Sequence, residues 1–202
     1  MESRDDTIAA IATPPGRGGI GIIKMSGPRS VEIAERIFHP RHASLPLESH
    51  RIYYGEIVHP RTRQTLDEVL VSFMAQPHSY TREDVVEINC HGGHVVLEQV
   101  LCLAISAGAR PAEPGEFTRR AFLNGRIDLA QAEAVIDLIE ARSAAGARQA
   151  AEQLKGSLSL ELNRLRDELL MVLSSLEASI EFPEDDLDPP SPEELRAQTG
   201  HI

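Results

Sequence analysis

The chain contains little cysteine, few aromatic residues and no tryptophan. Its two cysteines, Cys90 and Cys102, are too few for a disulfide framework and form no Cys-x-x-Cys pair, so we expect a reducing cytoplasmic compartment and no structural zinc. No apolar run approaches the roughly 20 residues that a membrane-spanning helix requires, so we expect no membrane contact. The acidic N-terminus lacks a following apolar segment, which argues against a signal peptide.

Basic residues are also scarce. Lys and Arg number 20 against 31 Asp and Glu, which gives a formal net charge of −11, and most of the excess follows residue 120. An acidic chain repels phosphate backbones, and an aromatic content of 4% leaves few rings for stacking on bases. The composition therefore argues against tight binding of RNA or DNA by this chain alone. A length of 202 residues fits one or two domains.

The first 110 residues alternate short β-rich runs with two apolar helical patterns. Turn signals separate them, such as Gly27-Pro28 and Gly92-Gly93. We expect strands over 7–12, 20–26, 52–58, 69–74 and 84–90, and helices over about 31–38 and 95–105. This predicts an α+β N-terminal domain, with a mixed sheet and two or more helices.

After Pro114 the pattern becomes wholly helical, and it predicts a partial all-α helical domain. A short helix is expected over 116–124, another from about residue 128, and a long one from about residue 147. The long helix carries apolar residues at alternating spacings of 4 and 3, which is a heptad seam: Leu158, Leu162, Leu165, Leu169, Val172 and Leu176. One such helix does not complete a bundle, so the sequence is expected to be part of a longer protein. We place the domains at 1–117 and 118–202.

We tested the sequence for two patterns that are typical of nucleotide-binding sites. Residues 16–21 match G-x-G-x-x-G, but a β-rich run follows the glycines where a dinucleotide-binding fold requires a helix. We therefore interpret the glycines as a sharp turn between strands. No G-x-x-x-x-G-K-[ST] sequence is present, so no P-loop nucleotide site is expected in this chain.

A cysteine and two histidines surround Gly92-Gly93. Cys90, His91 and His94 could form part of a metal site, but no second group of ligands is visible, so ordinary loop histidines are the favoured interpretation. Cys90 and His91 are adjacent on a predicted strand, where neighbouring side chains point to opposite faces, which disfavours a nucleophile–base pair. We predict no metal site and no catalytic residue here.

Three charged residues could have either a structural or a ligand-binding role. Glu87 lies within an apolar strand, on the face opposite Val86 and Ile88, as either a solvated carboxylate or an acceptor for two parallel N–H groups of a ligand. Lys24 also lies in an apolar strand, where its simplest role is to extend its ammonium group to the edge. Arg126 follows Asn124-Gly125 and would by default decorate a helix start.

Three long segments resemble one family, the tRNA modification GTPases called MnmE or TrmE. They are residues 6–27 (DTIAAIATPPGRGGIGIIKMSG), 80–93 (YTREDVVEINCHGG) and 110–134 (RPAEPGEFTRRAFLNGRIDLAQAEA). The likeness continues to about residue 184 and so covers nearly the whole chain. The resemblance implies a folate-binding α+β domain followed by a helical domain that a G domain interrupts. Binding of GTP, magnesium and potassium belongs to that G domain, which this sequence lacks, so no GTPase activity is expected of it alone.

The resemblance also implies a ligand, partners and site residues. The ligand is a tetrahydrofolate derivative, 5-formyltetrahydrofolate, that supplies a one-carbon unit for modifying C5 of the wobble uridine of tRNA. The partners are a second copy in a homodimer, the flavoprotein MnmG, and tRNA in the full complex. By position in the family's motifs, the folate-binding residues are Lys24, Glu87 and Arg126. The alternative is a dimerisation and scaffold module without significant folate binding, and titration with the folate separates the two.

Overall fold

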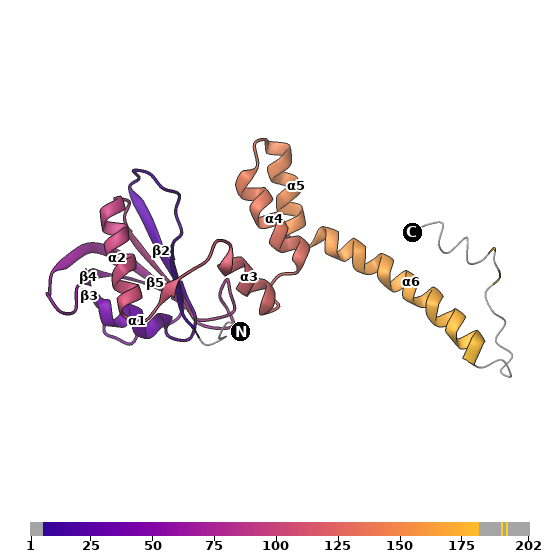
Figure 1. Ribbon diagram of the computed structural model, residues 1–202, viewed down its shortest axis with the longest axis horizontal. Coiled ribbons are helices and arrows are strands. Elements are labelled where there is room, and N and C mark those ends of the chain that lie inside the picture. The colour runs from indigo at the N-terminus through magenta and orange to yellow at the C-terminus, as the bar shows by residue number, and fades with distance from the viewer. Residues whose placement is uncertain (1–5, 182–190, 192, 194–202) are drawn as a thin grey trace. The chain divides into compact units, whose positions relative to one another are not determined.

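The computed structural model describes residues 6–181, 191 and 193. The chain divides into two compact units, Met1–Ile127 and Asp128–Ile202. The first contains all the strands of the described residues and three helices, and the second contains helices (Figure 1). The predicted class, an α+β domain followed by a helical domain, is confirmed.

A seven-stranded mixed sheet forms the first unit, in the order β3-β4-β5-β6-β2-β1-β7. Neighbouring strands are antiparallel except β1 and β7, which are parallel. The strands are β1 (Ile8–Ile11), β2 (Ile20–Ser26), β3 (Phe38–Pro40), β4 (Arg51–Val58), β5 (Thr65–Met74), β6 (Val85–His91) and β7 (Arg110–Pro111). The five predicted strands are confirmed, whereas the short strands β3 and β7 were not predicted.

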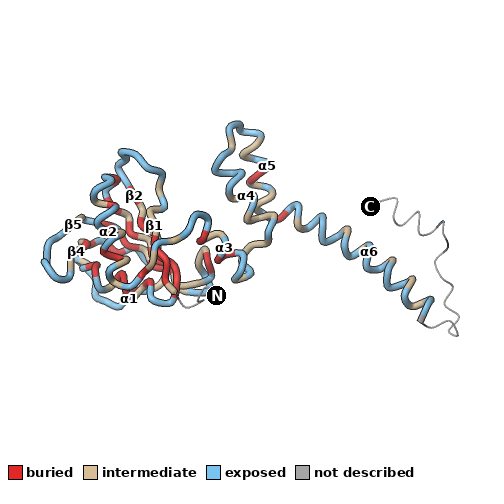
Figure 2. Tube along the Cα trace, viewed as in Figure 1, coloured by how far each residue is buried: buried red, intermediate tan, exposed pale blue. Residues whose placement is uncertain are grey.

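Helices α1 (Ser30–Ile37) and α2 (His94–Ser106) pack on one face of the sheet. Alternate residues of the central strands face them, so Ile23 and Met25 of β2 and Ile88 of β6 are fully buried. Figure 2 shows the buried residues gathered in this unit between the strands and helices. The residues between them in sequence, including Lys24 and Glu87, therefore point to the opposite face of the sheet, which we call the open face.

Helix α3 (Glu116–Leu123) ends the first unit and stops in a defined turn. The Gly125 amide donates to the Phe122 carbonyl and the Arg126 amide donates to the Ala121 carbonyl, with Gly125 at φ 68°. These two bonds form a Schellman motif, which needs a residue that tolerates positive φ, and glycine supplies it. The turn fixes the backbone of Arg126 next to the helix end.

The second unit consists of α4 (Leu129–Glu140), α5 (Ala144–Leu154) and α6 (Ser157–Glu181). Asp128 caps α4 through a capping box with Gln131. The single long helix predicted from about residue 147 is wrong, because the chain breaks between α5 and α6 at Gly156, which has φ 92°. Among the described residues, no helix is both long and apolar enough to cross a membrane.

Candidate functional site

Lys24 and Glu87 form an ion pair in the middle of the open face. Strands β2 and β6 are antiparallel neighbours in a register that sets Lys24 opposite Glu87. Lys24 Nζ lies 3.4 Å from Glu87 Oε1, and the two side chains are 17% and 31% exposed. Because this pair is only partly accessible to water, its charges are screened less than those of a fully exposed pair.

Large apolar side chains and polar ones share the open face with this ion pair. Across β4, β5 and β6, Ile52 pairs with Ser72, which pairs with Glu87. In the same way Tyr54 pairs with Leu70, which pairs with Asn89. Ile52, near the start of β4, is 72% exposed, and Leu70, in the middle of β5, is 45% exposed. An exposed apolar sheet face of this kind is typical of a surface that binds another molecule.

Two aromatic rings enclose the ammonium group of Lys24. Its Nζ lies 4.6 Å from the centre of the Tyr80 ring and 5.4 Å from the centre of the Phe117 ring. Tyr80 lies in the segment between β5 and β6, and Phe117 lies in the first turn of α3. Both distances are within the range in which a cation is attracted to an aromatic face. Neither ring was recognised from the sequence, where only the scarcity of aromatic residues could have drawn attention to them.

Arg126 joins the same cluster through Tyr80. Its Cζ lies 4.8 Å from the centre of the Tyr80 ring. The end of α3 is tied to this segment because Asn124 Nδ2 donates a 2.7 Å hydrogen bond to the Thr81 carbonyl. The structure thus brings Lys24, Glu87 and Arg126 into one cluster, the arrangement expected if they share a ligand.

A buried ion-pair network anchors α3 to the sheet. Glu116 is 1% exposed and accepts hydrogen bonds from Arg110 at 2.6 Å and from Arg120 at 3.0 Å. Arg120 also contacts Asp6 at 2.6 Å and Glu83 at 3.1 Å. The network links residues before β1, before β6 and within α3, so it fixes the helix that carries Phe117.

The carboxylates of this network are held ionised. Burial alone would raise the pKa of Glu116, but hydrogen bonds from Arg110, the Glu113 amide and Arg120 outweigh it and lower the pKa to about 2. For Asp6, burial again acts to raise the pKa, and hydrogen bonds from Arg110 and Arg120 bring it below its usual value.

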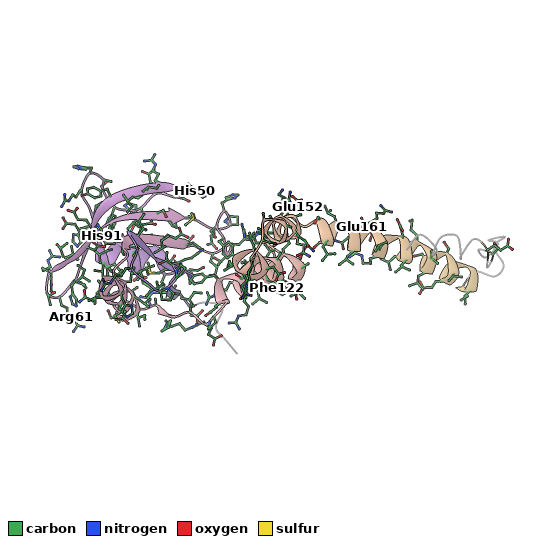
Figure 3. All side chains as sticks on the ribbon, turned by 90° about the horizontal axis from the view of Figure 1, so that it is seen from above. His50, Arg61, His91, Phe122, Glu152 and Glu161 are labelled. Carbon is green, nitrogen blue, oxygen red and sulfur yellow. The ribbon has the colours of Figure 1, made fainter. Side chains whose placement is uncertain are left out.

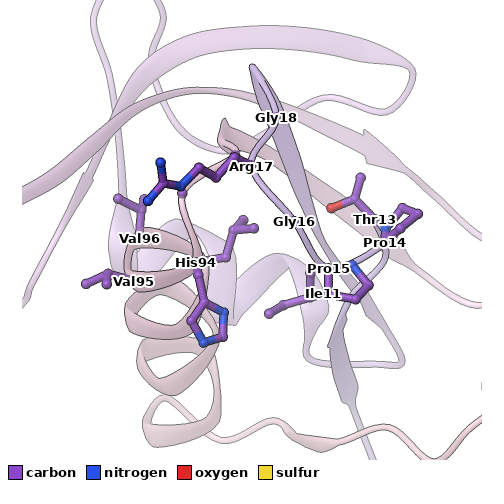
Figure 4. Close-up of a pocket in the computed structure, with 13 residues that line it drawn as sticks. Ile11, Thr13, Pro14, Pro15, Gly16, Arg17, Gly18, His94, Val95 and Val96 are labelled. Atoms are coloured by element: carbon purple, nitrogen blue, oxygen red, sulfur yellow. The ribbon is translucent and has the colours of Figure 1, made fainter.

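A separate hollow of about 940 Å³ lies between the glycine loop and the start of α2 (Figure 4). It is lined by Ile11, Thr13, Pro14, Pro15, Gly16, Arg17, Gly18, Gly92, Gly93, His94, Val95, Val96 and Leu97. Arg17 and His94 are its charged or titratable side chains, and the remaining side chains of its walls are mostly apolar. Lys24, Glu87 and Arg126 do not line this hollow, so it is distinct from the cluster on the open face.

Cys90, His91 and His94 do not converge. The Cys90 side chain belongs to the core, and burial, assisted by the charge of Asp67, raises the pKa of its thiol to about 12. His91 Nδ1 lies 2.6 Å from Asp67 Oδ1, and this hydrogen bond raises the pKa of the imidazole. His94 pairs with Glu98 on α2. In the described part of the chain, no three such side chains are grouped as metal ligands.

The fold and the cluster together define a class of protein. It has an α+β domain whose sheet is covered by helices on one face and exposes, on the other, an ion pair enclosed by aromatic rings. A helical unit follows it in sequence. Such a cluster offers a paired carboxylate, two cations and flat apolar walls, which suits the binding of a flat ligand that carries both N–H donors and negative charge.

Comparison with known proteins identifies the family. The family model described as the GTP-binding protein TrmE N-terminus matches residues 7–126, and the MnmE helical domain matches residues 129–202. Proteins named tRNA modification GTPase MnmE are 55% identical over 91% of this chain in Alkaliphilus oremlandii, 57% over 93% in Syntrophobacter fumaroxidans and 53% over 98% in Geobacter sulfurreducens. The chain therefore belongs to the TrmE/MnmE family. It spans about 40% of the length of these relatives.

Proposed function

We propose that this chain is the ligand-binding and dimer-forming part of a tRNA modification GTPase, and that its open-face cluster binds a reduced folate such as 5-formyltetrahydrofolate. The observation that carries the proposal is the Lys24–Glu87 pair, 3.4 Å apart and enclosed by Tyr80 and Phe117. A partly buried charged pair in the centre of a sheet face contributes little to stability by itself, so binding explains its position better than folding does.

The chemistry of a folate complements the cluster. A pterin ring presents a 2-amino group and a ring N–H side by side, and a carboxylate accepts both in a charge-assisted pair of hydrogen bonds. We assign this role to Glu87. The other end of a folate carries carboxylates, for which Lys24 and Arg126 are suitable partners. GTP hydrolysis belongs to a G domain outside this sequence, as do the magnesium and potassium that serve it.

The exposed apolar residues of the open face support a second part of the proposal. We infer that two copies pair through this face, so that each closes the site of the other, because the cluster lies on an open sheet face rather than in the hollow beside α2. The flavoprotein MnmG and tRNA are proposed partners of the whole protein rather than of this chain alone.

A scaffold function without folate binding is the alternative, and one contact favours it. The Glu87 carboxylate already has Lys24 as a partner in this structure, so a ligand must share or replace that ion pair. A folate that could not do so would leave a module that only dimerises.

Calorimetric titration of the full chain with 5-formyltetrahydrofolate separates the two functions. We expect saturable binding, and we expect Glu87→Gln to weaken it by roughly ten- to a hundredfold, because the substitution removes one charged hydrogen-bond acceptor while keeping its shape. Glu98→Gln is the matched control, since Glu98 lies on α2 and is 58% exposed. Equal affinity of Glu87→Gln and the unmodified chain would refute the assignment of Glu87.

A further inference from the structure

Tyr80 is held in place from several sides. Its hydroxyl lies 3.0 Å from Thr118 Oγ1 on α3. The next residue, Thr81, is fully buried, and its Oγ1 lies 2.6 Å from Ser26 Oγ at the end of β2. Asn124 Nδ2 donates to the Thr81 carbonyl. The sheet and α3 therefore fix the ring from both ends, so it does not depend on a ligand for its position.

Two cations share the Tyr80 ring. Lys24 Nζ and the Arg126 Cζ lie 4.6 and 4.8 Å from its centre. Both distances are within the range in which a cation is attracted to the negative face of an aromatic ring. For Arg126 this contact is the main restraint, because its exposed guanidinium has no other hydrogen bond, ion pair or ring contact within the described residues.

We propose that Tyr80 is a positioning residue of the open-face site, whose ring sets the places of Lys24 and Arg126 before a ligand arrives. The inference rests on the proposed folate function and extends it to a residue that touches the two cations rather than the ligand's charged groups. Lysine and arginine side chains lose considerable conformational entropy when a ligand fixes them. A ring that already fixes both reduces that cost at binding and thereby increases affinity for a ligand that carries negative charge.

Tyr80→Leu and Tyr80→Phe test the role of the ring. Both substitutions remove the hydroxyl, so the difference between them isolates the aromatic face. We expect Tyr80→Leu to weaken binding of 5-formyltetrahydrofolate by roughly tenfold in calorimetry, and Tyr80→Phe to bind within about threefold of the unmodified chain. Phe122→Leu is the control for loss of an aromatic residue from the same region, since Phe122 lies on α3 and is 40% exposed (Figure 3).

A second measurement needs no ligand. The protons next to the Lys24 ammonium lie over an aromatic ring, so their NMR signals should be shifted upfield. We expect Tyr80→Leu to reduce this shift and Tyr80→Phe to retain it. Should Tyr80→Leu fail to fold, as judged by circular dichroism, Tyr80→Met provides a second variant without a ring.

The outcomes separate this inference from the proposed function. Tyr80→Leu that binds folate as tightly as the unmodified chain, or that keeps the full upfield shift of Lys24, overturns the positioning role and leaves the folate function intact. An unmodified chain that binds no folate overturns the proposed function. In that case the NMR comparison still decides whether the ring positions the two cations.

Discussion

Glu116 shows how much one buried carboxylate can depend on its partners. It is 1% exposed and bonded to two arginines, and its pKa is lowered to about 2 from the ordinary value of 4.5. A carboxyl group with a depressed pKa stabilises the folded state fully above its unfolded pKa. This contribution is lost as the pH falls through the folded pKa. The stabilisation from Glu116 should therefore be complete above about pH 4.5 and disappear toward pH 2.

Glu116→Gln should lower the free energy of unfolding of the first unit by roughly 3 kcal/mol at pH 7, because the buried Arg120 and the partly exposed Arg110 lose the carboxylate that they share. Between pH 4.5 and 2 the unmodified chain should lose stability more steeply than this variant. Urea unfolding followed by tyrosine fluorescence reports on the first unit alone, since Tyr53, Tyr54 and Tyr80 all lie in it.

Glu113→Gln serves as the control for the acid-stability experiment. Glu113 lies three residues earlier and its side chain is 60% exposed, so its loss should change stability by less than about 1 kcal/mol. Identical pH dependence in Glu116→Gln and the unmodified chain would show that the network does not hold this carboxylate ionised.

At the scale of the element, the glycine loop between β1 and β2 is packed against the end of β6. A Cβ atom added at Gly92 would lie 2.4 Å from the carbonyl oxygen of Gly18, closer than any real contact allows. The Gly18 amide also donates to the Gly92 carbonyl at 3.5 Å. The absence of a side chain at Gly92 therefore lets the loop close over the start of α2.

Gly92→Ala should push this loop outward and destabilise the first unit by roughly 1–3 kcal/mol. The displaced loop should be cleaved by trypsin after Arg17 faster than in the unmodified chain, as measured by mass spectrometry of a limited digest. Gly93→Ala is the matched control, because its added Cβ would meet nothing closer than 3.9 Å. Equal cleavage rates in the two variants would contradict the proposed close approach.

Much of the element structure could be predicted, and the failures have physical causes. The strands carrying Lys24 and Glu87 could be predicted because apolar residues alternate along them. That these two strands are neighbours, in register at those residues, depends on contacts between segments far apart in the sequence. The short strands β3 and β7 were missed because two or three residues show no periodicity. The break at Gly156 was missed because an isolated glycine is tolerated within a helical pattern and does not by itself mark a break.

The candidate site could also be predicted only in part from the sequence. Lys24, Glu87 and Arg126 were chosen from resemblance to the family, and the structure shows that they share one cluster. Tyr80 and Phe117 were not chosen, because nothing in a linear pattern shows which rings will lie over a given cation. Three-dimensional proximity was needed to find them.

At the scale of the whole molecule, the exposed apolar face of the sheet is the feature that bears on assembly. Ile20, Ile52, Tyr54 and Leu70 are all at least 40% exposed, and the β-strand registers of the last three place them on the open face. Helices α1 and α2 cover the opposite face of the same sheet, so another molecule on that side meets the helices and not the strands. The open face is therefore the surface on which we expect two copies to meet.

Leu70→Asp should dissociate the proposed dimer, raising its dissociation constant at least about a hundredfold, because a carboxylate would be buried without a partner. Sedimentation velocity over a range of concentrations measures the change. Val95→Asp provides the control, since Val95 is 64% exposed and lies on α2 at the other face of the sheet. A dimer that survives Leu70→Asp as well as it survives Val95→Asp must be formed by another surface.

The contrast between the two thiols has a practical consequence for such work. Cys90 is 3% exposed with a pKa of about 12, whereas Cys102 is exposed on α2. A maleimide dye reacts with an accessible thiolate, so the natural sequence already offers one selective labelling position. That position lies on the helix-covered side, where an attached fluorophore would leave the open face unobstructed and could report energy transfer between subunits.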